Sequence, residues 1–153
     1  MRAGTTVGKA IKLRLRYRYA ARRKPLSLET YYKDHWVTIE DERLDRYDQM
    51  FQWSPAFERL LEPADIRTGQ IVGDLGCGPG FLSMQLLDKI GATGRVHAFD
   101  VNADFIARTH QKAKAGGISD RLTLHHLSSE RLPVEDATLD RIIAKNVMVY
   151  VDD

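Results

Sequence analysis

Residues 74–80 read Asp-Leu-Gly-Cys-Gly-Pro-Gly, and the sequence on both sides predicts the elements that this stretch connects. The run at 70–72, with its apolar Ile71 and Val72, predicts a buried strand, whereas the apolar residues of 81–90 recur at helical spacing. Glycines at alternate positions let the backbone turn sharply and let a ligand approach the main chain, where the first N–H groups of a helix lie unpaired. The sequence therefore predicts a strand, a ligand-binding glycine turn and a helix.

The spacing of the glycines and the acid before them indicate the kind of ligand. After Gly76 and Gly78, a dinucleotide-binding turn needs a third glycine at position 81, and this chain has Phe81 there. Asp74 would repel a phosphate, but it could hold an ammonium group. The stretch thus favours a ligand with a zwitterionic amino-acid tail over one with a pyrophosphate. The alternative enzyme class, which would bind a pyrophosphate here, is a nicotinamide-dependent oxidoreductase.

Strands and helices alternate after the glycine turn. The sequence predicts a strand at about 95–99 and then a helix, which Asn102 caps and which stops at 116–117. Further strands are predicted at 122–127 and 139–144. This order is typical of the α/β class, and we expect a Rossmann-like, doubly wound parallel sheet with helices on both faces. Right-handed crossovers would place the glycine turn and Asp100 at the same C-terminal sheet edge, where ligands bind.

With its preceding strand, the glycine turn resembles the first motif of class I S-adenosylmethionine-dependent methyltransferases. The similarity continues in the family's order: 96–100 resemble the second strand with its terminal acid, 132–140 resemble the segment that begins Leu-Pro, and 141–150 resemble the fourth strand and its loop. It covers roughly 70–153 and suggests small-molecule methyltransferases of the quinone and sterol kind. The resemblance implies methyl transfer, with S-adenosyl-L-methionine as cofactor.

The resemblance also implies a cofactor site. Asp74 would help hold the methionine end, and Asp100, which stands 20 residues after Gly80, would accept both ribose hydroxyls. Local capping of the backbone is the alternative role for each acid. Where the family often has an acid that touches the adenine amino group, this chain has two serines, whose hydroxyls could hydrogen-bond an adenine edge or simply stabilise a turn. The other candidate cofactor-binding residues are Gly76, Cys77, Gly78, Gly80, Val101, Ser128, Ser129 and Asn146.

No catalytic residue is assigned by the sequence. A methyl group on a sulfonium is already an electrophile, so its transfer depends mainly on positioning and on the exclusion of water. A general base is needed only for a protonated acceptor, and we expect His97, His125 and His126 to be core or surface residues instead. Cys77 is expected to be a packing residue, and the sequence has no Cys/His cluster with the spacing of a metal site.

Composition is consistent with one enzyme domain, which we expect to be cytoplasmic. The chain has 153 residues, of which 43% are hydrophobic and 29% charged, enough for a single core. Its one cysteine excludes an internal disulfide, and the sequence has no apolar run of the length that spans a bilayer.

Basic residues are concentrated at the N-terminus. The first 24 residues contain nine Lys or Arg and no acid, which leaves 14 bases against 21 acids in the remainder. We expect 1–27 to form a flexible basic arm that contacts RNA or an anionic membrane surface, directs import into an organelle, or is only a solvated tail.

Two further regions complete the expected organisation. Residues 28–69 are predicted to form a helical cover whose aromatic side chains, Tyr47, Phe51 and Trp53, line the site or build a core.

Residues 70–153 would be the N-terminal portion of a methyltransferase domain, because the family's sheet has seven strands and this one is incomplete after the fourth. We therefore expect a fragment that is weakly active or inactive, with a non-catalytic cofactor-binding module as the alternative. The acceptor is expected to be an unidentified small molecule.

Overall fold

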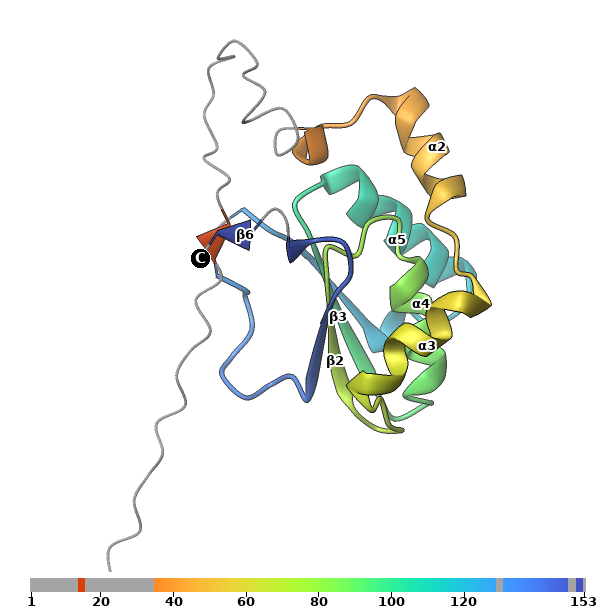
Figure 1. Cartoon of the computed structure of the whole chain (residues 1–153), viewed down its shortest axis with the longest axis vertical. Coiled ribbons are helices and arrows are strands. Elements are labelled where there is room, and N and C mark those ends of the chain that lie inside the picture. The colour runs from red at the N-terminus through yellow and green to blue at the C-terminus, as the bar shows by residue number, and fades with distance from the viewer. Residues whose placement is uncertain (1–13, 16–34, 129–130, 149–150, 153) are drawn as a thin grey trace, which may run out of the picture.

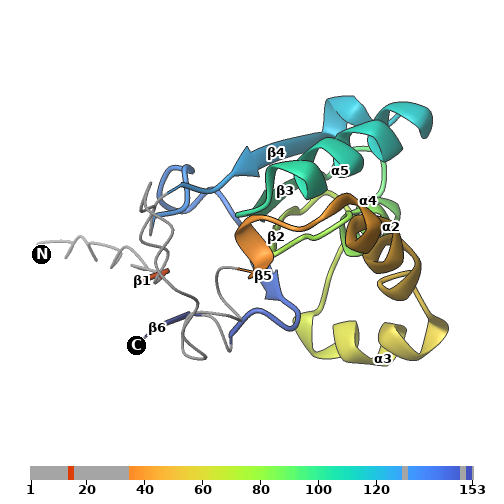
Figure 2. The same ribbon diagram turned by 90° about the horizontal axis from the view of Figure 1, so that it is seen from above.

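The centre of the molecule is a four-stranded parallel sheet (Figure 1), and its strands lie in the order β4-β3-β2-β5, as the labels of Figure 2 show. It is seen in a computed structural model that describes residues 14–15, 35–128, 131–148 and 151–152. This order confirms the predicted Rossmann-like parallel sheet. Most of the predicted basic arm, and Ser129, lie outside the described residues. The strands are β2 (Ile71–Leu75), β3 (Arg95–Asp100), β4 (Leu122–His126) and β5 (Arg141–Ala144).

One face of the sheet is covered by helices. The crossovers through α4 (Phe81–Lys89) and α5 (Ala103–Ala115) run in the same direction along the sheet, so right-handed connections place both helices on one face. Leu86 and Leu87 of α4 and Val72 and Val96 of the sheet form a core that is fully buried. Burial of these side chains is the main stabilising term for this layer.

The opposite face carries an extended segment rather than a second helical layer in the described residues. Phe99 is fully buried there, and Leu132, Val134 and Leu139 pack on its cluster from the segment between β4 and β5. Figure 1 shows this segment on the side of the sheet away from α4 and α5. One of the two helical layers expected from the sequence is thus present in the part that the structure describes.

The N-terminal region is helical, as predicted, but it is divided into short pieces. Its elements are α2 (Asp41–Met50), η1 (Pro55–Phe57), α3 (Glu58–Leu61) and η2 (Glu62–Ala64). Ser54 caps η1, since its hydroxyl accepts a hydrogen bond from the Ala56 N–H at 3.4 Å. Figure 2 shows α2 lying beside α5, where Arg108 pairs with Asp45 at 2.7 Å and Lys112 pairs with Asp48.

Three short elements complete the chain. The turn η3 (Ser119–Arg121) leads into β4, and β1 (Arg14–Leu15) pairs antiparallel with β6 (Val151–Asp152), a pairing that the sequence did not predict. None of the helices in the described ranges has the length and apolar character that a membrane span requires.

Candidate cofactor site

A cavity of about 290 Å³ opens at the C-terminal edge of the sheet. Its wall contains the glycine turn from 74 to 79, Asp100 and Val101 at the end of β3, and 145–147 after β5. The cover contributes Trp36 and Phe51, of which the sequence had named Phe51 as a possible lining residue. Tyr47 and Trp53 are absent from the lining and pack in hydrophobic clusters. The topology therefore brings the ends of β2, β3 and β5 and the helical cover to one crevice, as the sequence predicted for the glycine turn and Asp100.

The three glycines of the turn have different physical roles. All have positive φ: 71° for Gly76, 52° for Gly78 and 87° for Gly80. A Cβ on Gly76 would lie 2.2 Å from Val147 Cγ2, and one on Gly80 would lie 2.6 Å from Thr109 Oγ1, whereas a Cβ on Gly78 would meet nothing within 4 Å. Gly76 and Gly80 are thus required by packing and conformation, and Gly78 is the position that leaves open space.

The first N–H groups of the turn are hydrogen-bonded within the protein. Gly76 and Cys77 donate to the carbonyl oxygen of Phe99 at 2.8 and 3.0 Å. The Gly78 N–H donates to Asp100 Oδ2 at 2.8 Å. These bonds tie the turn to β3, so this part of the turn offers a ligand a close surface rather than unpaired donors.

Asp100 lies at the end of β3 and is 7% exposed. Besides the bond from Gly78, its Oδ1 accepts a hydrogen bond from the Asn102 N–H at 2.9 Å. Burial raises the pKa of Asp100 to about 6, although these backbone donors favour its ionised form. A carboxylate oxygen accepts more than one hydrogen bond, so both oxygens retain capacity for hydroxyl donors. Asn102 itself caps α5, as predicted, through a 2.9 Å bond from the Phe105 N–H to its side-chain oxygen.

Asp74 forms the inner wall of the cavity. It is 1% exposed, and its Oδ2 accepts a hydrogen bond from Ser83 Oγ at 2.6 Å. Burial raises the pKa of Asp74 to about 7; the Ser83 hydrogen bond and the charge of Lys145 act against this rise. The neighbouring charge of Asp100 adds to it. Ser83 and Lys145 were not singled out from the sequence, where an isolated Ser in a helix and a Lys after a strand carry no specific signal.

The remaining candidates divide into two groups. Cys77, Val101 and Asn146 line the cavity, and burial raises the pKa of the Cys77 thiol, which is consistent with a packing role. Gly80 and Ser128 are not among the lining residues; a Cβ on Gly80 would meet Thr109, and Ser128 is exposed. The adenine contact of Ser128 stays a prediction.

None of the three histidines is among the residues that line the cavity. His97 and His125 stack with ring centroids 5.2 Å apart, and their Nδ1 and Nε2 atoms are 3.0 Å apart. Burial lowers the pKa of both rings. His126 Nε2 lies 3.1 Å from the carbonyl oxygen of Val101. No group of three metal-binding side chains occurs in the ranges that the structure describes.

Comparisons with known proteins place this geometry in a family. The Methyltransferase domain family matches residues 72–153. The methyltransferase GfsG of Streptomyces halstedii is 31% identical over 96 residues, which cover 63% of this chain and 34% of that protein. The demethylmenaquinone methyltransferase of Bacillus cytotoxicus is 29% identical over 104 residues, 64% of this chain and 44% of its own length. The chain thus spans about a third to less than half of these two relatives.

A solved structure shows the same fold. The crystal structure of a methyltransferase dependent on S-adenosylmethionine from Aquifex aeolicus has a TM-score of 0.58 with 22% identity, and the match covers 70% of this chain and 57% of that one. The family match includes the glycine turn, Asp100 and strands β3 to β5. Because the matched residues make up more than half of the chain and contain most of the cavity wall, the chain belongs to the class I S-adenosylmethionine-dependent methyltransferases.

Proposed function

We propose that this chain is the cofactor-binding part of an enzyme that methylates a small-molecule acceptor with S-adenosylmethionine. The observation that carries the proposal is the convergence of the glycine turn and Asp100 on one cavity, joined by the bond from Gly78 N–H to Asp100. When bound, S-adenosylmethionine supplies an electrophilic methyl group on its sulfonium sulfur. The protein then needs to hold the cofactor, orient it and exclude water.

The charges of the cavity and the open space in its wall support this cofactor. Asp100 would accept the ribose hydroxyls, and Asp74 would attract the ammonium of the amino-acid end. The open space beside Gly78 would let the nucleoside lie against the main chain, since no Cβ stands there. Trp36 and Phe51 supply apolar walls that exclude water from the reacting end.

For the acceptor, we propose a small molecule with an aromatic ring system of the quinone kind. Relatives include the demethylmenaquinone methyltransferase named above and a 2-phytyl-1,4-naphtoquinone methyltransferase of Trichormus variabilis, which is 31% identical over 100 residues. The aromatic side chains of the cover, Trp36 and Phe51, support a flat apolar acceptor at the mouth of the cavity. RNA or membrane binding by the basic arm, a cytoplasmic location and organelle import stay predictions.

Transfer of a labelled methyl group tests this proposal. The purified chain is incubated with methyl-tritiated S-adenosylmethionine and with chemically reduced menadione, chemically reduced demethylmenaquinone or total RNA, and the label in each acceptor is counted. The quinones are supplied as quinols because the electron-rich reduced ring attacks the methyl group and then loses a proton, while the cofactor leaves as the thioether. We expect label in a quinol and none in RNA, and we expect Asp100→Asn to reduce it strongly. Binding of the cofactor with no transfer to any acceptor would favour the non-catalytic alternative, and label in RNA alone would refute the small-molecule acceptor.

A further inference from the structure

Lys145 is the cation of the cavity wall. It follows β5 directly, and among the lining residues in the described ranges it is the only lysine or arginine. Its Nζ lies 4.4 Å from the centroid of the Phe57 ring. Within the part of the chain that the structure describes, no carboxylate lies within 4.0 Å of this ammonium. Lys145 thus presents a charge at the cavity and has no ion-pair partner among the described residues.

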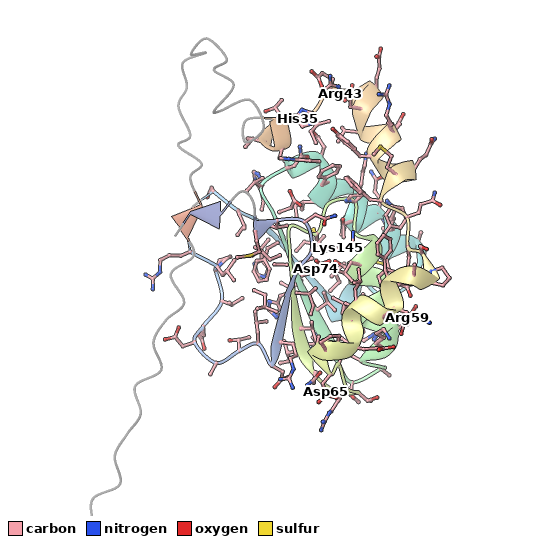
Figure 3. All side chains as sticks on the ribbon, viewed as in Figure 1. His35, Arg43, Arg59, Asp65, Asp74 and Lys145 are labelled. Atoms are coloured by element: carbon pink, nitrogen blue, oxygen red, sulfur yellow. The ribbon has the colours of Figure 1, made fainter. Side chains whose placement is uncertain are left out.

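The sheet places this ammonium on one side of the two buried acids. Leu75 is in register with Ala144, so Lys145 stands beside the start of the glycine turn, while Asp100 ends the strand on the other side of β2. Asp74 lies between them and feels the charge of Lys145. Figure 3 shows Lys145 and Asp74 near one another at the centre of the molecule. A ligand whose sugar meets Asp100 would therefore extend its other end toward Lys145.

The charges of the cavity complement those of the cofactor. With all groups ionised, Asp74, Asp100 and Lys145 sum to −1. S-adenosylmethionine carries a sulfonium, an ammonium and a carboxylate, and therefore sums to +1. When ionised, Asp74 and Asp100 have no hydrogen-bond donor and no positive charge for the carboxylate of the cofactor. A carboxylate that enters a largely apolar cavity without a partner has a large desolvation cost. Among the lining residues that the structure describes, Lys145 is the cationic side chain that can offset this cost.

We propose that Lys145 binds the carboxylate of the amino-acid end of the cofactor; this inference rests on the proposed function. The ring of Phe57 holds the ammonium by a cation–π contact before the cofactor arrives. A lysine stem has enough rotational freedom to leave the ring and meet a carboxylate, and a charge-assisted hydrogen bond is stronger than the contact it replaces. The amino-acid end is then recognised by opposite charges from two strands, Asp74 from β2 and Lys145 from the end of β5.

The test compares two ligands that differ by one carboxylate. S-adenosylhomocysteine and its decarboxylated form, which keeps the amine, are titrated calorimetrically into the full chain and into Lys145→Ala, with Lys145→Met as a second variant that keeps the stem. We expect both variants to lower the affinity for S-adenosylhomocysteine about ten- to a hundredfold, which is the range for a charge-assisted hydrogen bond. The affinity for the decarboxylated ligand should change by no more than about twofold. Lys114→Ala, an exposed position on α5, is the matched control and should change neither affinity.

Each other outcome has a definite meaning. An equal loss for both ligands in the variants would overturn the proposal, because Lys145 would then shape the cavity rather than bind the carboxylate. Unchanged binding of S-adenosylhomocysteine would also overturn it. If the unmodified chain binds neither ligand, the proposed function itself has failed. Circular dichroism of each variant identifies any that does not fold, in which case Lys145→Met decides.

Discussion

Replacing Gly76 with alanine should destabilise the fold by about 2–4 kcal/mol. The backbone there has φ of 71°, in the left-handed region where a side chain costs about 1 kcal/mol. In addition, the new Cβ would lie 2.2 Å from Val147 Cγ2, far inside contact distance, and such overpacking costs about 1–3 kcal/mol. The effect on the free energy of unfolding is measured by equilibrium denaturation in urea.

Two controls separate strain from overlap. The backbone at Gly78 has φ of 52°, but the space around a Cβ there is open. Gly78→Ala should therefore lower the free energy of unfolding by only about 1 kcal/mol. Its methyl group would instead occupy space beside the cavity and weaken S-adenosylhomocysteine binding. Adding Val147→Ala to Gly76→Ala removes the overlapping methyl, so the double variant should lose less than the two single losses combined. Equal losses at Gly76 and Gly78, or strict additivity with Val147→Ala, would refute the assignment of Gly76 to packing.

Three further predictions concern the acids, a cap and the cover. Asp74 and Asp100 have native pKa values of about 7 and about 6, above the ordinary 3.8, so the native state keeps protons that the unfolded chain loses. The free energy of unfolding should therefore fall as pH rises from about 4 to about 7, by at most about 1.4 kcal/mol per pH unit for each group, and Asp100→Asn should flatten this fall in urea melts at pH 4 to 6. Asn102→Ala should cost about 1–2 kcal/mol in thermal denaturation, because it removes the buried cap of α5; an unchanged melting temperature would contradict this. Arg108→Ala should speed hydrogen exchange of α2 amides at a cost below about 1 kcal/mol, whereas the exposed Lys114→Ala should leave that exchange unchanged.

Much of the fold could be predicted because its signals are local. The glycine turn, the helix that follows it and the Asn102 cap depend on neighbouring residues, and each lies where the sequence indicated. The parallel order of the strands followed from their alternation with helices. The segmentation of the cover was not predictable, because aromatic spacing alone does not show where a helix stops, and Phe51 begins a turn after α2.

The candidate site was predicted in outline but not in its contacts. Asp74 and Asp100 could be named from their places before and after the glycine turn. Ser83 and Lys145 could not be named, because the tertiary fold brings them to Asp74 and the cavity. Ser83 lies nine residues after Asp74, and Lys145 follows the end of β5. The overlap that a side chain at position 76 would make likewise involves Val147, which is distant in sequence.

We propose that the glycine turn and Asp100 form a site for a sulfonium nucleoside. Calorimetric titration of the chain with S-adenosylhomocysteine and, separately, with NADH tests this site. We predict binding of one S-adenosylhomocysteine per chain, no heat with NADH, and an affinity at least about tenfold lower in Asp100→Asn, the loss expected for a hydrogen bond to a charged group. NADH binding of equal strength, or binding of S-adenosylhomocysteine that does not depend on Asp100, would refute this site.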